Sequence, residues 1–230
     1  MRRRALLAAS LSSFAVPAVI RPARAGAVPV VLELFTSQGC SSCPPADALL
    51  GRLVRRSGVI ALAWHVDYWD GLGWRDPFAS RAATERQRAY AARLGAEVYT
   101  PALVIGGRRM EVGSDAEAIE AAIATTPVPP VTLGLRRTVD GLVAEVGAAP
   151  TRVMATLAFY EPEHATRIGA GENGGRHLTE YRIVRTAQVA GIWDGTARRI
   201  TLPSPPPGQG AVLLVQSDDL AVVGAADLPA

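Results

Sequence analysis

The sequence predicts an α/β domain followed by a small all-β, sandwich-like domain, and three observations support this. Two short apolar runs, Val30–Phe35 and Val59–Val66, enclose a stretch with helical spacing. A stiff proline-rich linker, "TTPVPPV" at Thr125–Val131, follows. Beyond the linker, only short runs of alternating polarity remain. We therefore expect a first domain at 26–126 and a second at 127–230.

The first half begins with a strand–helix–strand unit. Val30–Phe35 is a buried strand, and Cys43–Arg56 is a helix whose first turn tolerates Pro44 and Pro45. Val59–Val66 is the next buried strand. This order implies two parallel strands joined by a right-handed crossover.

Two further helices and a hairpin complete this half. The expected elements are a helix at Ala79–Leu94, strands at Ala102–Ile105 and Arg109–Val112, and a helix at Ala116–Ala124. Gly106 and Gly107 mark the hairpin turn, and Ser114 or Asp115 caps the last helix. The resulting order is β-α-β-α-β-β-α.

The second half has the pattern of an all-β module. Val131, Leu133 and Leu135 alternate with polar residues, and a turn follows at Asp140-Gly141. The remaining expected strands are Leu142–Val146, Val153–Tyr160, Ile183–Ile192, Arg199–Leu202, Val212–Gln216 and Leu220–Val223. Short strands at such intervals predict a small sandwich.

The N-terminus has the features of a cleaved export signal. A basic start, an apolar stretch at 5–20 and the small-x-small site Ala23-Arg24-Ala25 occur in that order. Arg3-Arg4 also permits twin-arginine export, beside the general secretory route. We expect the chain to be periplasmic or secreted, with no membrane span in the mature protein.

Charge argues against nucleic-acid binding. The whole chain carries a net charge of +3, but residues 1–25 contain five arginines and no acid, so their removal leaves −2. A basic surface that would hold phosphates is therefore not expected.

The chemistry of the chain centres on "TSQGCSSCPPAD", which contains both cysteines, Cys40 and Cys43. At the start of a helix, free N–H groups and the helix dipole stabilise a thiolate. Cys40 would face solvent and act as the nucleophile, and Cys43 would resolve the mixed disulfide. A C-x-x-C pair near a βαβ unit is typical of a redox motif.

Two other segments are expected beside the cysteines. His65, Asp67 and Trp69 follow the second strand at the edge where the first strand also ends. The third strand is expected to run antiparallel, which brings Thr100-Pro101 to the same edge, and this X-Pro bond is a candidate for the cis form.

Four segments together resemble a known family. They are "ELFTSQGCSSCPPAD", "HVDYWDGLGWRDPF", "YTPALVIGG" and "GENGGRHLTEY". The chain resembles the thioredoxin superfamily and, more narrowly, the domain of unknown function 1223 family of secreted bacterial proteins. The resemblance implies a thioredoxin-like fold for the first half and a redox-active pair at Cys40 and Cys43. It also implies that Pro101 is a cis-proline and that Thr100 offers its backbone to a substrate; it supplies no reaction.

One position departs from the thioredoxin pattern. Leu34 stands where thioredoxins place a buried aspartate that serves proton transfer. Glu33 is adjacent but points to the other face of the strand. His65, Asp67 and Glu33 are therefore the candidate acid–base groups.

Three functions follow from these residues. The first is a thiol–disulfide oxidoreductase or redox partner of exported proteins. The second is a non-enzymatic binding module with an inert disulfide, in which the tryptophan loop, "DYWDGLGWRDPF" at 67–78, and the β domain recognise a protein or envelope component. The third is copper(I) handling by the two thiolates and His65. We expect no resident metal or cofactor. We expect the glycine-rich segment 169–174 to be a polar loop that packs against the first half. Glu172 and Arg176 are of interest because they belong to the family-like segment "GENGGRHLTEY".

Overall fold

The computed structural model describes residues 29–230. The predicted export signal at 1–25 lies outside the described residues. The first half contains β1 (Val30–Thr36), α1 (Pro44–Leu53), β2 (Val59–His65), α2 (Arg81–Leu94), β3 (Ala102–Ile105), β4 (Arg109–Val112) and α3 (Ala116–Thr125). The order β-α-β-α-β-β-α is as predicted. Within 29–230, no helix combines the length and apolar character needed to cross a membrane.

The second half consists of strands. They are β5 (Leu133–Thr138), β6 (Gly141–Val146), β7 (Val153–Arg167), β8 (His177–Trp193), β9 (Arg198–Leu202), β10 (Gly210–Ser217) and β11 (Val222–Leu228). One eight-stranded sheet runs β11-β10-β7-β8-β2-β1-β3-β4, and a three-stranded sheet runs β5-β6-β9. The fold is therefore mixed α/β with one large sheet and three helices among the described residues.

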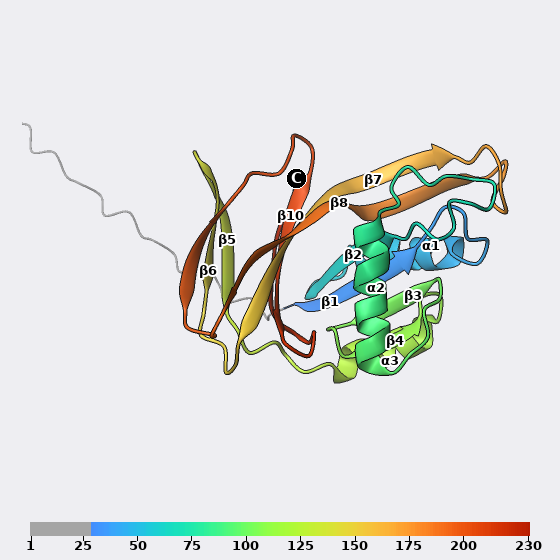
Figure 1. Ribbon diagram of the computed structural model, residues 1–230. Coiled ribbons are helices and arrows are strands. Elements are labelled where there is room, and N and C mark those ends of the chain that lie inside the picture. Colours follow the sequence, from blue (N-terminus) through green and yellow to red (C-terminus); the bar gives the residue numbers. More distant parts are fainter. Residues whose placement is uncertain (1–28) are drawn as a thin grey trace, which may run out of the picture.

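The helices cover both faces of the first half of the large sheet. Leu49 and Leu50 of α1 and Ile119 of α3 pack against Leu32 and Leu34 of β1. On the opposite face, Ala83 and Tyr90 of α2 pack with Val31 and Phe35 of β1, as the helix crossing in front of the strands shows (Figure 1). Successive side chains along a strand point to opposite faces, so each strand contributes to the apolar cores on both sides of the sheet.

The two halves share the large sheet. β8 pairs with β2 in parallel at Ala63 and Ile183, on the side of β2 away from β1. The three-stranded sheet packs its apolar face on β7 and β10 around Leu142, Leu157 and Leu213. The sheet-on-sheet packing expected of the second half is present, but one of those sheets continues into the first half.

The β7–β8 hairpin is longer than the sequence predicted. We expected strands at Val153–Tyr160 and Ile183–Ile192 with a loop between them, whereas pairing continues to Arg167 and His177. The outer part of β7 is charged and largely exposed, and the outer part of β8 buries Leu178 but also the charged Glu180, so neither shows the apolar alternation that marks a half-buried strand. Figure 1 shows this hairpin reaching from the β half across to α1. It brings the glycine-rich segment to the cysteines.

Candidate functional site

The two cysteines form a disulfide at the start of α1. Cys43 is the N-cap residue, and its carbonyl accepts the N–H groups of Ala46 and Asp47 at 2.8 and 3.1 Å. The helix begins at Pro44, one residue later than predicted, because Cys43 already serves as its cap. The pair therefore lies at the positive end of the helix dipole.

Contrary to prediction, Cys40 does not face solvent. Both cysteines are fully buried, while Ser41 and Ser42 between them are exposed. The tip of the β7–β8 hairpin binds the backbone around Cys40: Asn173 Nδ2 donates to the carbonyls of Gln38 at 2.9 Å and Cys40 at 2.8 Å. We call Asn173 the cap of the disulfide.

Two neighbours of the cap also hold it in place. Arg176 donates to the side-chain oxygen of Asn173 at 2.8 Å, and the Glu172 carboxylate accepts the Ser41 N–H at 3.1 Å. Gly73 and Gly171 have positive φ and touch each other, with 3.2 Å between the Gly171 Cα and a Cβ placed on Gly73. The expected contact between the glycine-rich segment and the first half is therefore present.

Gln38 links three segments beneath the cap. Its side-chain nitrogen donates to Glu180 of β8 at 2.7 Å, its side-chain oxygen accepts from Trp74 at 3.0 Å, and its backbone N–H donates to Asp76 at 2.8 Å. The side chain is fully buried. These bonds fix the turn that leads into Cys40.

A buried group of charges lies at the same edge of the sheet. His65 ends β2 opposite Thr36 of β1, and its Nδ1 lies 2.7 Å from an Asp76 oxygen. Its Nε2 lies 3.8 Å from Glu180 Oε1, and neither of these two atoms has a hydrogen-bond partner among residues 29–230. Together with Asp47, these residues form what we call the acid–histidine cluster: Asp47, His65, Asp76 and Glu180.

The pKa values in the acid–histidine cluster follow from burial and mutual charge. Burial opposes the charged imidazole, but Asp76, Glu180 and Asp47 outweigh it and raise the pKa of His65 to about 9. The pKa of Asp76 is lowered, because the charge and hydrogen bond of His65 outweigh burial there. Burial raises the pKa of Glu180. His65 and Asp76 thus form an ion pair at neutral pH.

Asp47 is the member of the cluster nearest to the cysteines along the chain. Its carboxylate accepts the Thr36 hydroxyl at 2.9 Å, and its N–H donates to the Cys43 carbonyl one turn earlier. Burial raises its pKa to about 7, against the opposing charge of His65. A carboxyl that titrates near neutrality one helical turn after Cys43 is suited to exchange protons with a thiol.

The structure brings Trp69, Thr100 and Pro101 together. The Thr100–Pro101 peptide bond is cis, and Trp69 Nε1 donates to Thr100 Oγ1 at 2.8 Å. Trp69 is half-buried, and a Cβ placed on Gly39 would lie 3.1 Å from its Cβ. The tryptophan loop thus connects the turn before Cys40 with the start of β3.

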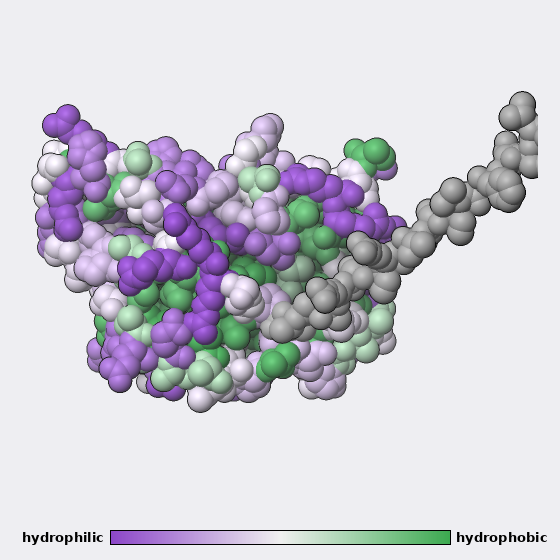
Figure 2. Space-filling model, turned by 180° about the vertical axis from the view of Figure 1, so that it is seen from behind, coloured by the Kyte–Doolittle hydropathy of each residue, from purple (hydrophilic) through white to green (hydrophobic). Residues whose placement is uncertain are grey.

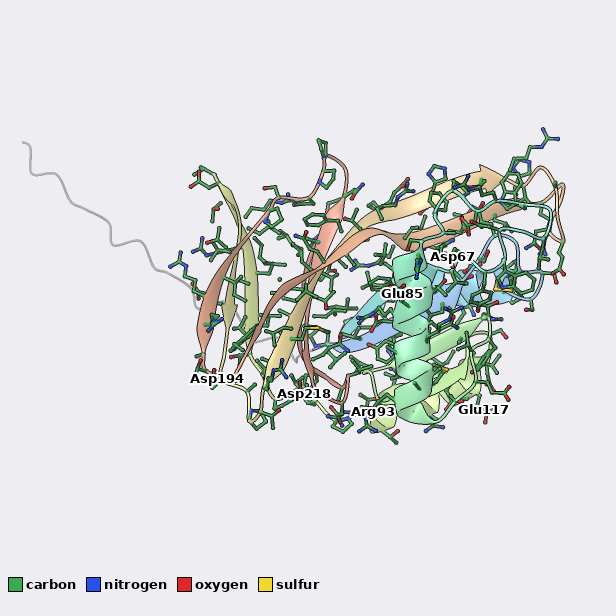
Figure 3. All side chains as sticks on the ribbon, viewed as in Figure 1. Asp67, Glu85, Arg93, Glu117, Asp194 and Asp218 are labelled. Atoms are coloured by element: carbon green, nitrogen blue, oxygen red, sulfur yellow. A yellow bond between two sulfur atoms is a disulfide. The ribbon has the colours of Figure 1, made fainter. Side chains whose placement is uncertain are left out.

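Asp67 and Glu33, the other two predicted acid–base groups, lie outside the acid–histidine cluster. Asp67 accepts from Thr84 of α2 at 2.5 Å and lies beside the first turns of that helix (Figure 3). Glu33 is buried on the α2 face of β1, where Arg86 donates to both of its oxygens at 2.5 and 2.9 Å. Both carboxylates bind α2 residues.

Metal binding has little geometric support among the described residues. Within 29–230, no three or more His, Cys, Asp or Glu side chains are arranged to hold a metal ion. Of the copper(I) ligands considered above, His65 has its Nδ1 hydrogen-bonded to Asp76.

The comparisons with known proteins identify the family. The family described as "Protein of unknown function (DUF1223)" matches residues 31–216. The chain belongs to the DUF1223 family. No curated protein matches it.

Two solved structures share the DUF1223 chain's architecture. A protein from Agrobacterium tumefaciens is 32% identical, with a TM-score of 0.80 over 88% of this chain and 95% of that one. HBP35 of Porphyromonas gingivalis is 13% identical, with a TM-score of 0.63 over 89% of this chain and 76% of that one. The second likeness concerns the fold alone.

Sequence reasoning missed most of the acid–histidine cluster. Asp47, Asp76 and Glu180 were not candidate acid–base groups, and neither Gln38 nor Asn173 was singled out. A signal was present, because all five residues lie inside three of the four segments that carry the family resemblance. Those segments meet at the disulfide.

Proposed function

We propose that this protein is a thioredoxin-like thiol–disulfide oxidoreductase or redox partner that acts on exported proteins outside the cytoplasm. The observation that carries the proposal is the Cys40–Cys43 disulfide at the start of α1 with Asp47 one turn further on. Thr100, cis-Pro101 and Trp69 supply the substrate-facing side in this proposal.

The reaction moves two electrons between the cysteine pair and a substrate. When the pair is reduced, the Cys40 thiolate attacks a substrate disulfide, forms a mixed disulfide and releases one substrate thiolate. The Cys43 thiolate then attacks the Cys40 sulfur, and the second substrate thiolate leaves. Asp47 takes the Cys43 proton. The reverse sequence oxidises a substrate dithiol, and a dithiol or disulfide protein resets the pair.

The buried disulfide sets a condition on this reaction. Because Asn173 binds the Cys40 carbonyl, the hairpin tip has to move before a substrate reaches the sulfur. A partner that displaces the tip would gain access faster than a small thiol would. The cap therefore favours exchange with selected partners.

Equilibration with glutathione tests the proposal. The protein is held in buffers of varied reduced-to-oxidised glutathione ratio, and free thiols are counted by alkylation. Reversible exchange in the folded state is the expected result, and trapping of a mixed disulfide by Cys43→Ser in cells then identifies the substrate. A pair that stays oxidised until the protein unfolds would contradict the proposal.

Burial of both cysteines favours a second candidate, a binding module with an inert disulfide. In that case Cys40→Ser with Cys43→Ser retains binding and cellular phenotype. Loss of phenotype in the double variant, with folding intact, would rule it out.

A further inference from the structure

A groove lies beside the disulfide, between α1 and the start of β8. It has a volume of about 370 Å³ and extends from Pro44, next to Cys43, to Arg55 beyond the end of α1. Tyr181 forms its floor, because a Cβ on Gly51 would lie only 2.4 Å from the ring. Because Gly51 has no side chain, the Tyr181 ring of β8 lies directly against α1.

The walls of the groove are basic. Arg52 lines it from α1 and Arg55 from just beyond the end of that helix, while Arg176 and His177 line it from the opposite side, where β8 begins. We call it the arginine groove. All four side chains are exposed. Figure 2 shows the face of the molecule opposite to the view of Figure 1, where strongly hydrophilic side chains lie beside apolar patches.

The three arginines have no carboxylate partner among residues 29–230, where the ion pairs involve other arginines. Residues 1–28 contain no Asp or Glu that could supply one. The adjacent Arg56, by contrast, pairs with Glu120 of α3. Unpaired guanidinium groups that converge on one groove are suited to bind carboxylates.

The groove is connected to the disulfide at both of its walls. Pro44 follows Cys43 directly, and Asp47 lines the groove from the first turn of α1. On the other wall, Arg176 donates to Asn173, which caps Cys40. A ligand that takes up the Arg176 guanidinium would therefore act on a group that holds the cap.

We propose that the arginine groove binds an acidic polypeptide segment of the partner protein and so places that partner beside the disulfide. Arg52, Arg55 and Arg176 lie on two elements and line a volume much larger than a single anion, which favours several carboxylates on one chain over a phosphate ion. That the segment belongs to a redox partner rests on the proposed function; the binding of acidic peptide does not.

A fluorescent peptide tests the binding. Fluorescence anisotropy is measured with a labelled peptide that contains four glutamates and with its glutamine counterpart. We expect saturable binding of the glutamate peptide alone, weakened by salt and by Arg52→Gln with Arg55→Gln about fivefold. Arg136→Gln with Arg199→Gln makes the same charge change on the exposed three-stranded sheet and should leave affinity within twofold.

The outcomes separate this proposal from the redox proposal. Equal affinity in the groove and control variants, absent binding, or equal competition by inorganic phosphate at matched ionic strength would overturn the groove. Binding that persists in Cys40→Ser with Cys43→Ser supports the groove even if the disulfide fails to exchange with glutathione. Exchange with glutathione but no peptide binding would overturn the groove alone.

Discussion

Two buried charged clusters lie on opposite faces of the large sheet, and they differ in how completely they are satisfied. On the α2 face, both oxygens of Glu33 accept from Arg86, and Tyr90 also bonds the carboxylate. On the α1 face, the acid–histidine cluster leaves His65 Nε2 and Glu180 Oε1 without hydrogen-bond partners in the described part of the chain. One cluster pairs its charges, and the other leaves carboxyls with raised pKa values beside a disulfide.

The difference indicates separate roles. A paired, hydrogen-bonded charge in the interior fixes the packing of α2 on β1 and β10, because Gln216 of β10 also accepts from Arg86. An incompletely paired cluster costs free energy of folding, which a purely structural role does not explain. We therefore assign stability to the Glu33 side, and in the proposed redox function proton exchange belongs to the Asp47 side.

The largest expected effect concerns the Glu33 side. Arg86→Met leaves a buried carboxylate unpaired and should lower the free energy of unfolding by about 3–5 kcal/mol, measured by urea denaturation. Arg81→Met removes an exposed pair with Glu85 on the same helix and should cost less than about 0.5 kcal/mol. Similar losses in the two variants would contradict the structural assignment.

The Asp47 side should instead make the free energy of unfolding depend on pH. His65 has its folded pKa raised from 6.5 to about 9, so its contribution is complete below pH 6.5 and is lost as the pH rises through 9. Its neighbours Asp47, Asp76 and Glu180 supply the charge that raises it. Urea denaturation should show a loss on the order of 3 kcal/mol between pH 6 and pH 9.

Asp47→Asn sharpens this result. The Asp47 pKa is raised from 3.8 to about 7, so ionisation destabilises the fold as the pH rises from about 4 to 7. The variant should therefore gain stability relative to wild type over that range. An unchanged difference between the two proteins at pH 4.5 and pH 7.5 would count against a buried, titrating Asp47.

A smaller effect concerns access to the disulfide. Asn173→Ala removes two hydrogen bonds to the loop around Cys40 and should speed reduction by dithiothreitol about tenfold. Glu172→Ala removes one exposed bond to Ser41 and should change the rate about twofold at most. The rates are measured by alkylation of released thiols, and equal rates in both variants would show that Asn173 is no barrier.

The smallest effect concerns the tryptophan loop. Trp69→Phe deletes the bond to Thr100 and should cost about 1 kcal/mol of stability. Thr100→Val should cost a similar amount, and the double variant should cost little more than either single one. Full additivity in this cycle would mean that the two side chains do not interact.

The sequence alone predicted the order of elements in the first half, because apolar periodicity and the turn signals at Gly106-Gly107 mark them directly. It also brought Cys40, His65 and Thr100 to one edge, since strand direction determines where strands end. It did not predict that Cys40 is covered. The pairing of β8 with β2 and the extended hairpin depend on contacts between residues far apart in the chain, such as Asn173 with Cys40.

The acid–histidine cluster escaped prediction for the same reason. Asp47 and Glu180 carry no local sign of burial, because a carboxylate on a helix or strand is ordinarily solvated. Their role becomes visible only when α1, β2 and β8 meet. In the proposed redox function, Asp47 of α1 takes the proton-transfer role that thioredoxins give to an aspartate at the position of Leu34.

The reduction potential of the Cys40–Cys43 pair shows whether Asp47, and not the Glu33 side, acts on the disulfide. It is measured at pH 7 in glutathione buffers for wild type, Asp47→Asn and Tyr90→Phe, the last of which alters the Glu33 side alone. We expect a shift of about 30 mV or more, a tenfold change in the equilibrium constant, for Asp47→Asn and none for Tyr90→Phe. Equal potentials in all three proteins would contradict it.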